Sequence, residues 1–308
     1  TTYGIAGIYT TATMTITGST ISNNSATNFQ SDGGGIGLYG GFLTITRSII
    51  TGNSGEYAGG IQLYGGSGVL ITDTTISGNT ARQGGGGISK WYSSNSVPIS
   101  IVNSTISGNT AGSGAGINTW ASPVTITNST ISNNSASYKG GGIYMVDSST
   151  QLKVTNSTIT GNRANTGNLG GDGGGIYAEP ALPIPNSTLN STIVAGNLIG
   201  TGTTPNDLSG HPITSAANSL IGDSATSGGI VNGVGGNKVG FAVSSILNTT
   251  LANNGGPTQT HALVANSPAI DAGSNTVPTP LDFDQRGTGF PRIINDPSIA
   301  NVADGTDI

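Results

Sequence analysis

The sequence predicts an all-β fold, a single-stranded parallel β-helix with about 28 residues per coil that ends in an irregular C-terminal region. Two features of the composition and one of the order of residues support this prediction. Gly accounts for 52 of the 308 residues and only 7% of side chains are charged, and the remainder is rich in Ser, Thr and Asn, which disfavour helices. The hydrophobic share of 34% argues against a disordered chain. Finally, a short unit recurs along the chain, and units too short to bury an apolar face alone must stack on one another.

Each repeat begins with two apolar residues that flank a third residue, as in Ile99-Ser100-Ile101. Such alternation predicts a half-buried strand. A further apolar residue follows five positions later, here Ile106, and this step leaves room for a bend that returns the chain inward. Because stacked coils rise by ~4.8 Å each, seven or eight repeats predict a rod of roughly 35–40 Å.

An Asn closes each repeat, three residues after the last apolar residue. The intervals between successive members of this series are 29, 26, 30, 25, 28 and 35 residues. Asn tolerates the left-handed conformation of a bend, and identical Asn side chains in register can form a hydrogen-bonded ladder. We therefore interpret the series as a structural ladder rather than as a ligand site: Asn24, Asn53, Asn79, Asn109, Asn134, Asn162 and Asn197.

Gly-rich runs that close on Ile separate the repeats, and their last residues are Ile36, Ile61, Ile88, Ile117, Ile143 and Ile176. Gly allows the tight bends that a coil needs. A phosphate-binding loop would require a following Lys-Ser/Thr or a helix, and neither follows these runs. The gap between the Asn and this Ile varies from 8 to 14 residues, so loops of unequal length are expected along one edge of the rod.

Aromatic residues gather within four positions after these Ile residues and form the candidate ligand-binding face: Tyr39, Tyr64, Trp91, Trp120, Tyr144 and Tyr177. The first four follow their Ile by three positions. If the Ile points inward, strand alternation sends such a residue outward. Flat rings on one face suit stacking against sugar rings or a partner chain. The alternative, a self-stacking row of rings that shields the sheet, stays open.

The composition changes towards the C-terminus. Eleven of the 13 Pro residues lie from Pro180 onward. Residues 1–200 hold six basic and six acidic side chains, whereas residues 201–308 hold three and eight, so the whole net charge of −5 belongs to the second part. We therefore expect regular coils over residues 1–200 and an irregular, acidic end region over residues 201–308, where Pro cannot join a central ladder.

Several motifs resemble a known group of proteins. Ser-Thr-Ile-Ser-Gly-Asn-Thr-Ala at 104–111 and the Gly-Gly-Gly-Ile runs resemble the repeats of bacterial secreted right-handed parallel β-helix proteins and, loosely, of polymorphic outer-membrane proteins. The tail is similar to the C-terminal region of choice-of-anchor proteins on bacterial surfaces, on the strength of its motifs at 191–197, 218–223, 253–263, 267–273 and 284–287. The resemblance implies a right-handed coil, a bacterial origin and a secreted, extracellular or cell-surface location. Cys residues that many such proteins carry in the tail are missing here.

No catalytic constellation is recognisable, and we expect neither an enzyme nor a cofactor. Hydrolysis of glycans needs paired carboxylates about 5–9.5 Å apart, whereas the acids of the coil region are scattered. In the tail, Asp271, Asp282 and Asp284 could gather around calcium, but pairing of Arg286 with a carboxylate is favoured, which leaves a metal site unknown.

These observations favour an extracellular structural or adhesive protein, with a polysaccharide-binding module as the alternative and a polysaccharide lyase or hydrolase as a weaker one. Strand edges at the coil ends suggest self-association end to end or by strand donation. Nine scattered basic residues give no surface for nucleic acid, and no apolar run approaches the ~20 residues of a transmembrane segment.

Overall fold

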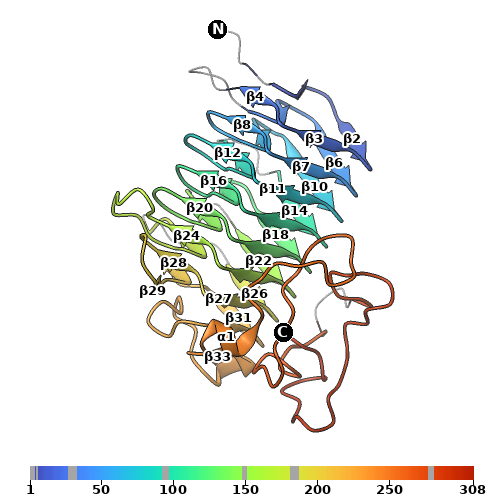
Figure 1. Ribbon diagram of the computed structural model, residues 1–308, viewed down its shortest axis with the longest axis vertical. Coiled ribbons are helices and arrows are strands. Elements are labelled where there is room, and N and C mark those ends of the chain that lie inside the picture. The colour runs from blue at the N-terminus through green and yellow to red at the C-terminus, as the bar shows by residue number, and fades with distance from the viewer. Residues whose placement is uncertain are drawn as a thin grey trace.

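The computed structural model describes residue 4 and residues 6–26, 33–91, 97–147, 151–180, 187–276 and 281–308. It confirms the predicted all-β parallel solenoid: successive coils stack along one axis, and strands from equivalent positions pair in parallel (Figure 1). Each full coil contributes one strand to each of four sheets, which we number in the order in which the chain visits them.

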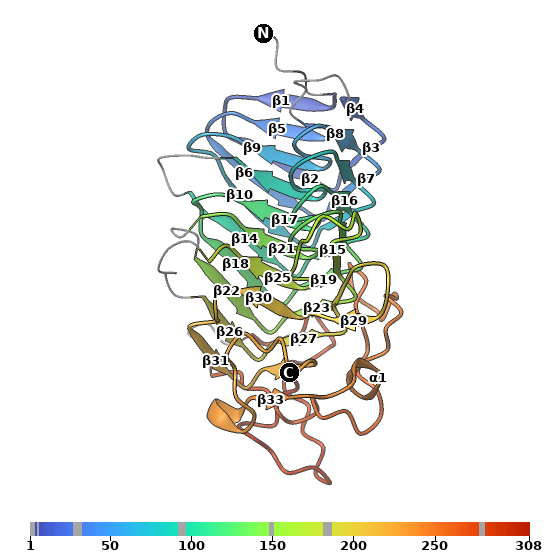
Figure 2. The ribbon, with the colours of Figure 1, turned by 90° about the vertical axis from the view of Figure 1, so that its left-hand side faces the viewer.

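Sheet 1 contains the strands that follow the Gly-rich runs (Figure 2). All its strands but the last begin with the Ile of the Gly-Ile motif, which Leu208 replaces in the last strand, and this position is buried from the second coil onward. They are β1 (Ile8–Thr10), β5 (Ile36–Leu38), β9 (Ile61–Leu63), β13 (Ile88–Lys90), β17 (Ile117–Thr119), β21 (Ile143–Met145), β25 (Ile176–Ala178) and β30 (Leu208–Gly210).

Sheet 2 contains the strands with two apolar residues in alternation. The register aligns equivalent positions, so that Ile71 pairs with Ile45 on one side and with Ile101 on the other. The strands are β2 (Met14–Thr17), β6 (Phe42–Thr46), β10 (Gly68–Thr72), β14 (Ile99–Val102), β18 (Val124–Thr127), β22 (Leu152–Thr155), β26 (Thr188–Asn190) and β31 (Ser215–Ala217).

Sheet 3 carries the last apolar residue of each repeat, and sheet 4 contains two-residue strands after the Asn series. Sheet 3 consists of β3 (Thr20–Ser22), β7 (Ile49–Thr51), β11 (Thr75–Ser77), β15 (Thr105–Ser107), β19 (Thr130–Ser132), β23 (Thr158–Thr160), β27 (Ile193–Ala195), β32 (Leu220–Ile221) and β33 (Lys238–Val239). Sheet 4 consists of β4 (Ser25–Ala26), β8 (Ser54–Gly55), β12 (Thr80–Ala81), β16 (Thr110–Ala111), β20 (Ser135–Ala136), β24 (Arg163–Ala164), β28 (Leu198–Ile199) and the antiparallel β29 (Thr204–Pro205).

The sheets continue past residue 200, to β33, although the sequence places the end of the regular coils there. The apolar pair Leu220 and Ile221 is fully buried and keeps the repeat pattern, which explains why the coil continues. A 3₁₀ turn, η1 (Val234–Gly236), and one helical turn, α1 (Val243–Ile246), follow in this last part of the coil region.

The described residues 247–276 and 281–308 form a tail of isolated bridges and turns. Its first effect is to cover the outer face of sheet 3 at the last coils. There Ile246, Leu247, Ala269 and Ala272 form a second core with Leu220 and other outward-pointing residues of β27 and β32, whereas the neighbouring Ile221 belongs to the main core inside the coil. The tail then runs beside the coils along the edge between sheets 2 and 3 (Figure 1).

Gln285 fixes the tail to that edge. Its side-chain oxygen accepts a hydrogen bond from the Thr130 hydroxyl at 2.8 Å, and its amide nitrogen lies 2.9 Å from the hydroxyls of both Thr105 and Thr258. The flanking Arg286 and Asp284 form an ion pair, in which the guanidinium Nη2 lies 2.5 Å from the carboxylate. The Asp-Gln-Arg-Gly motif thus forms a tight loop in which Gln285 bonds to two neighbouring coils.

Candidate functional site

The Asn series forms a continuous ladder inside the coil. In its middle, Asn109 donates from Nδ2 to Asn134 Oδ1 at 2.9 Å and to the Ile76 carbonyl at 3.0 Å, and its own Oδ1 accepts from the backbone and side-chain nitrogens of Asn79. The same pattern joins Asn24, Asn53, Asn79, Asn109, Asn134, Asn162 and Asn197. From Asn53 onward these side chains have no exposed surface. Their polar atoms are used within the coil, which argues for a structural role.

The ladder ends on a carboxylate. Asn197 Nδ2 donates to Asp207 Oδ1 at 2.8 Å, and the other oxygen of Asp207 accepts from the Asp223 amide at 2.8 Å. Burial raises the pKa of Asp207 to about 6, and the hydrogen bonds from Asn197 and Asp223 oppose that rise.

A second ladder, of hydroxyl groups, escaped the sequence analysis. It lies two residues before the last apolar residue of each repeat, where Thr74 donates its hydroxyl to the Thr72 carbonyl and accepts from the Ser48 amide. Its members are Ser48, Thr74, Ser104, Ser129, Ser157, Thr192 and Ser219. The signal was a Ser or Thr at this position in every repeat, which the abundance of these residues concealed.

Four aromatic residues form a column at the end of sheet 1. Each backbone amide donates to the coil before it, for example Trp91 to the Leu63 carbonyl at 3.1 Å and Trp120 to the Lys90 carbonyl at 3.2 Å. The rings of Tyr39 and Tyr64 are stacked with centroids 4.4 Å apart, and those of Trp91 and Trp120 are tilted with centroids 5.8 Å apart. We call Tyr39, Tyr64, Trp91 and Trp120 the aromatic column.

The rings of the aromatic column both stack on one another and reach solvent. Trp91 is 36% exposed, and the other three are half-buried. The two interpretations made from sequence are therefore not exclusive, because ring faces within the column pack together while part of Trp91 remains accessible.

Tyr144 and Tyr177 do not extend this column, so the six aromatic residues of the candidate face do not form one continuous row. Both follow their Ile by one residue, so they lie within β21 and β25, and the column position is taken by Val146 and Glu179. Tyr177 is buried, with 8% of its surface exposed.

A small polar network surrounds these two tyrosines. The Tyr144 hydroxyl donates to Glu179 at 2.7 Å, and Lys139 Nζ lies 2.8 Å from the same carboxylate and 4.7 Å from the centroid of the Tyr177 ring. Burial, followed by the hydrogen bond to Glu179, raises the pKa of Tyr144.

Beside the two Trp residues lies a hollow of about 180 Å³, whose lining includes Gln83, Lys90, Asn118 and Tyr144. Lys90 is the unexpected member. It takes the register position of Leu63 and Thr119 in sheet 1 and is only 1% exposed. Its ammonium group lies 2.6 Å from the Gly65 carbonyl and 2.5 Å from the Ser67 carbonyl, and burial lowers its pKa to about 8.

Aligning the repeats by their Gly-Ile motif would have found Lys90, because Leu38 and Leu63 occupy its place in the two preceding coils. The numbers of basic and acidic residues in the sequence could not reveal that this lysine is buried. The hollow thus combines indole faces, amides and a weakly basic amine, and the described residues that line it include no carboxylate.

The part of the chain that the structure describes contains no group of three or more His, Asp or Glu side chains placed to hold a metal ion. In the tail, Asp284 pairs with Arg286, as the salt-bridge interpretation of the sequence expected. No helix among the described residues is long and apolar enough to cross a membrane.

Comparison with known proteins gives one result. Residues 3–205 match the family described as a right-handed beta helix region, which fixes the hand of the coil. Neither a curated protein nor a solved structure matches the chain.

Proposed function

Since the chain belongs to the family of right-handed β-helix proteins, we propose that it acts as an extracellular adhesive protein of the bacterial cell surface that binds polysaccharide on its aromatic column. The observation that carries this proposal is the column itself, four rings in consecutive coils that end at a hollow between Trp91 and Trp120. Aromatic faces stack well on the apolar faces of sugar rings, while nearby amides bond to hydroxyls.

The spacing of the column suits a chain-like ligand. Equivalent residues in neighbouring coils are separated by one strand spacing of about 4.8 Å, so rings recur along the rod at intervals comparable with a sugar unit. A polysaccharide lying along the rod could meet several rings at once, and such multiple contacts raise overall affinity.

Binding rather than catalysis is the proposed activity. Among the residues that the structure describes, those lining the hollow include no carboxylate, whereas glycoside hydrolysis uses a pair of them. Lys90 could act as a base by its pKa, but its ammonium group is bonded to two backbone carbonyls and is buried.

End-to-end growth into fibres is less well supported than adhesion. The segment around Ile230 continues the stack beyond β30, and Ile230 is buried against the main core, so stacking of copies through that end would have to displace it. Contact with the surroundings is therefore proposed along the flank of the rod.

The proposal is tested by affinity electrophoresis through gels that contain neutral or acidic polysaccharides. We expect one of these polysaccharides to retard the protein, and Trp91→Ala with Trp120→Ala to lower the affinity roughly 3- to 10-fold for each ring removed. Val234→Ala, which shortens a 62% exposed apolar side chain outside the aromatic column, is the control and should bind normally.

Circular dichroism and thermal unfolding must show that the double variant keeps its fold. Equal retardation of the folded variant and the parent protein would contradict binding at the aromatic column. Release of shorter sugars from the retarding polysaccharide would instead establish a catalytic function.

A further inference from the structure

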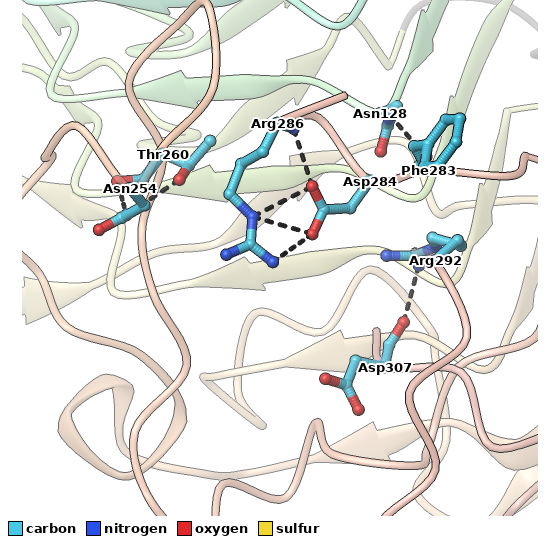
Figure 3. A network of polar contacts seen from close by, with 8 residues as sticks. All are labelled: Asn128, Asn254, Thr260, Phe283, Asp284, Arg286, Arg292 and Asp307. Carbon is cyan, nitrogen blue, oxygen red and sulfur yellow. Dashed lines mark hydrogen bonds and ion pairs between the residues drawn. The ribbon is translucent and has the colours of Figure 1, made fainter. Parts of the chain in front are cut away.

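A cavity of about 250 Å³ lies between the tail and the coils. Its lining combines turns between sheets 2 and 3, including Asn128 and Asn156, with tail residues that include His261 and Arg292. Figure 3 shows Asn128 and Arg292 together with the tail residues Asp284, Arg286 and Asp307. A water molecule occupies about 30 Å³ in the liquid, so this space can hold a small organic molecule.

Arg292 is a buried cation that faces this cavity without a close anion. Only 9% of its surface is exposed. Its Nη2 donates to the Asp307 carbonyl at 2.7 Å and lies 3.2 Å from Asn156 Oδ1, both neutral acceptors, and its Nε has no partner. Burial lowers its pKa, and Asp284, Asp307 and Asp304 oppose that effect from a distance.

The nearest carboxylates are already engaged. Asp284 accepts both Nε and Nη2 of Arg286, and Asp307 accepts the amide of Asp271. The ion pairs within the described residues, all with N–O distances of 2.5 to 2.8 Å, do not include Arg292. A buried guanidinium without an ion-pair partner is unfavourable, and an anion in the cavity would compensate it.

Two further polar atoms of the cavity walls are buried without a partner, Asn156 Nδ2 and His261 Nε2. The amide nitrogen is a donor. His261 Nδ1 lies 2.9 Å from the Asn248 carbonyl, which can only accept, so Nδ1 carries the hydrogen. Burial lowers the pKa of His261, the ring is therefore neutral at pH 7, and Nε2 is left as an acceptor.

Beside the carboxylates of Asp284, which is paired with Arg286, and of Asp307, the cavity lining thus offers two unpartnered donors and one unpartnered acceptor. Carboxylate oxygens would accept from Arg292 and Asn156, and a hydroxyl group would donate to His261. We propose that this cavity binds a small hydroxycarboxylate, with its carboxylate on Arg292 and a hydroxyl on His261.

Calorimetric titration of the full chain with three matched probes tests the proposal. Gluconate carries a carboxylate and hydroxyls, sorbitol carries hydroxyls alone, and acetate carries a carboxylate alone. We expect gluconate to bind, acetate to bind at least tenfold more weakly, and sorbitol not to bind. Equal binding of gluconate and sorbitol, or of neither, overturns the proposal.

Variants then locate the site. Arg292→Gln removes the cation and is expected to weaken gluconate binding about 10- to 100-fold, which is the range for a hydrogen bond to a charged group. Arg47→Gln is the matched control, because Arg47 occupies the same turn position as Asn156 in an earlier coil but is exposed. Unchanged binding by a folded Arg292→Gln protein contradicts the assignment.

A second variant covers the case in which Arg292→Gln fails to fold. Asn156 has a left-handed φ of 50°, which Gly also adopts, so Asn156→Gly removes the amide while the turn is kept. We expect weaker gluconate binding, with Asp73→Gly, at a φ of 49° in the same turn column, as control. His261→Phe should abolish the preference for gluconate over acetate, and retention of that preference would exclude His261 from the site.

Discussion

At the scale of single residues, the Asn ladder shows how one position in a repeat can be understood from sequence alone. The recurrence of Asn at one position predicts the hydrogen-bonded ladder that the structure contains, because a ladder needs the same side chain in every coil. Asp207 could not be predicted, since it directly precedes β30, where earlier coils have the Gly of the Gly-Ile motif, and it accepts from Asn197 in place of a further Asn. Neither could the burial of Tyr177, because Tyr9 and Tyr144 follow their Ile by the same single residue and yet are exposed and half-buried.

Lys90 is the residue whose environment makes the clearest thermodynamic prediction. Its pKa is lowered to about 8 in the folded protein from an ordinary value of 10.5. Below pH 8 the amine is charged in both states, and burial of that charge destabilises the fold. Between pH 8 and about 10.5 the unfolded chain binds more protons, so the free energy of unfolding rises with pH, by on the order of 3 kcal/mol in total.

Urea unfolding at pH 7 and pH 9.5 checks this prediction. The parent protein should gain stability between the two pH values relative to Lys90→Met, which lacks the amine and should be the more stable of the two at pH 7. Lys153→Met, which removes an exposed amine from sheet 2, is the control and should follow the parent curve. Parallel pH curves for Lys90→Met and the parent protein would show that the amine is solvated.

At the scale of elements, the two sequence features that define the repeat, the Asn series and the Gly-Ile motif, are in contact. A Cβ atom built on Gly116 would lie 2.5 Å from the Gly142 carbonyl oxygen of the next coil and 3.2 Å from Asn134 Nδ2. The equivalent glycines Gly35, Gly60, Gly87, Gly142 and Gly175 meet the Asn ladder and the next coil in the same way. The Gly that precedes each Ile is thus required by the closeness of ladder and strand, a reason that the sequence alone did not reveal.

Gly116→Ala is therefore expected to lower the free energy of unfolding by about 1–3 kcal/mol, because the added methyl meets backbone atoms that cannot move aside. Gly202→Ala is the matched control, since a Cβ there meets nothing within 4 Å. Chemical denaturation of both variants gives the measurement. A Gly116→Ala protein as stable as Gly202→Ala would mean that neighbouring coils can separate at little cost.

The existence of the strands was predictable because alternation and spacing are local signals, and the structure follows them from β2 to β27. The tail was not predictable in this way. Its segments form isolated bridges, and its position depends on single side chains such as Gln285 that meet coils far away in sequence. The cavity between tail and coils follows from that docking and has no local signature.

At the scale of the whole molecule, Gln285 determines whether tail and coils behave as one body. Gln285→Ala leaves the hydroxyls of Thr105, Thr130 and Thr258 without this partner. We expect a loss of about 1–3 kcal/mol in docking of the tail. Limited proteolysis should then cleave the tail more rapidly while a fragment that contains the coils persists. Gln259→Ala, an exposed glutamine in the same tail, should be cleaved at the parent rate, and equal rates for both variants would show that Gln285 does not hold the tail.

The docked tail also sets an order of events in folding. Ladder contacts between neighbouring coils join residues 25 to 35 positions apart, whereas Gln285 meets Thr130 and Ser104 across 155 and 181 positions. Closing short loops is entropically easier than closing long ones, so coils can form progressively while the tail has nothing to dock on until they exist. Docking of the tail therefore comes last in folding, and a tail that resists proteolysis indicates that the coils on which it docks have formed.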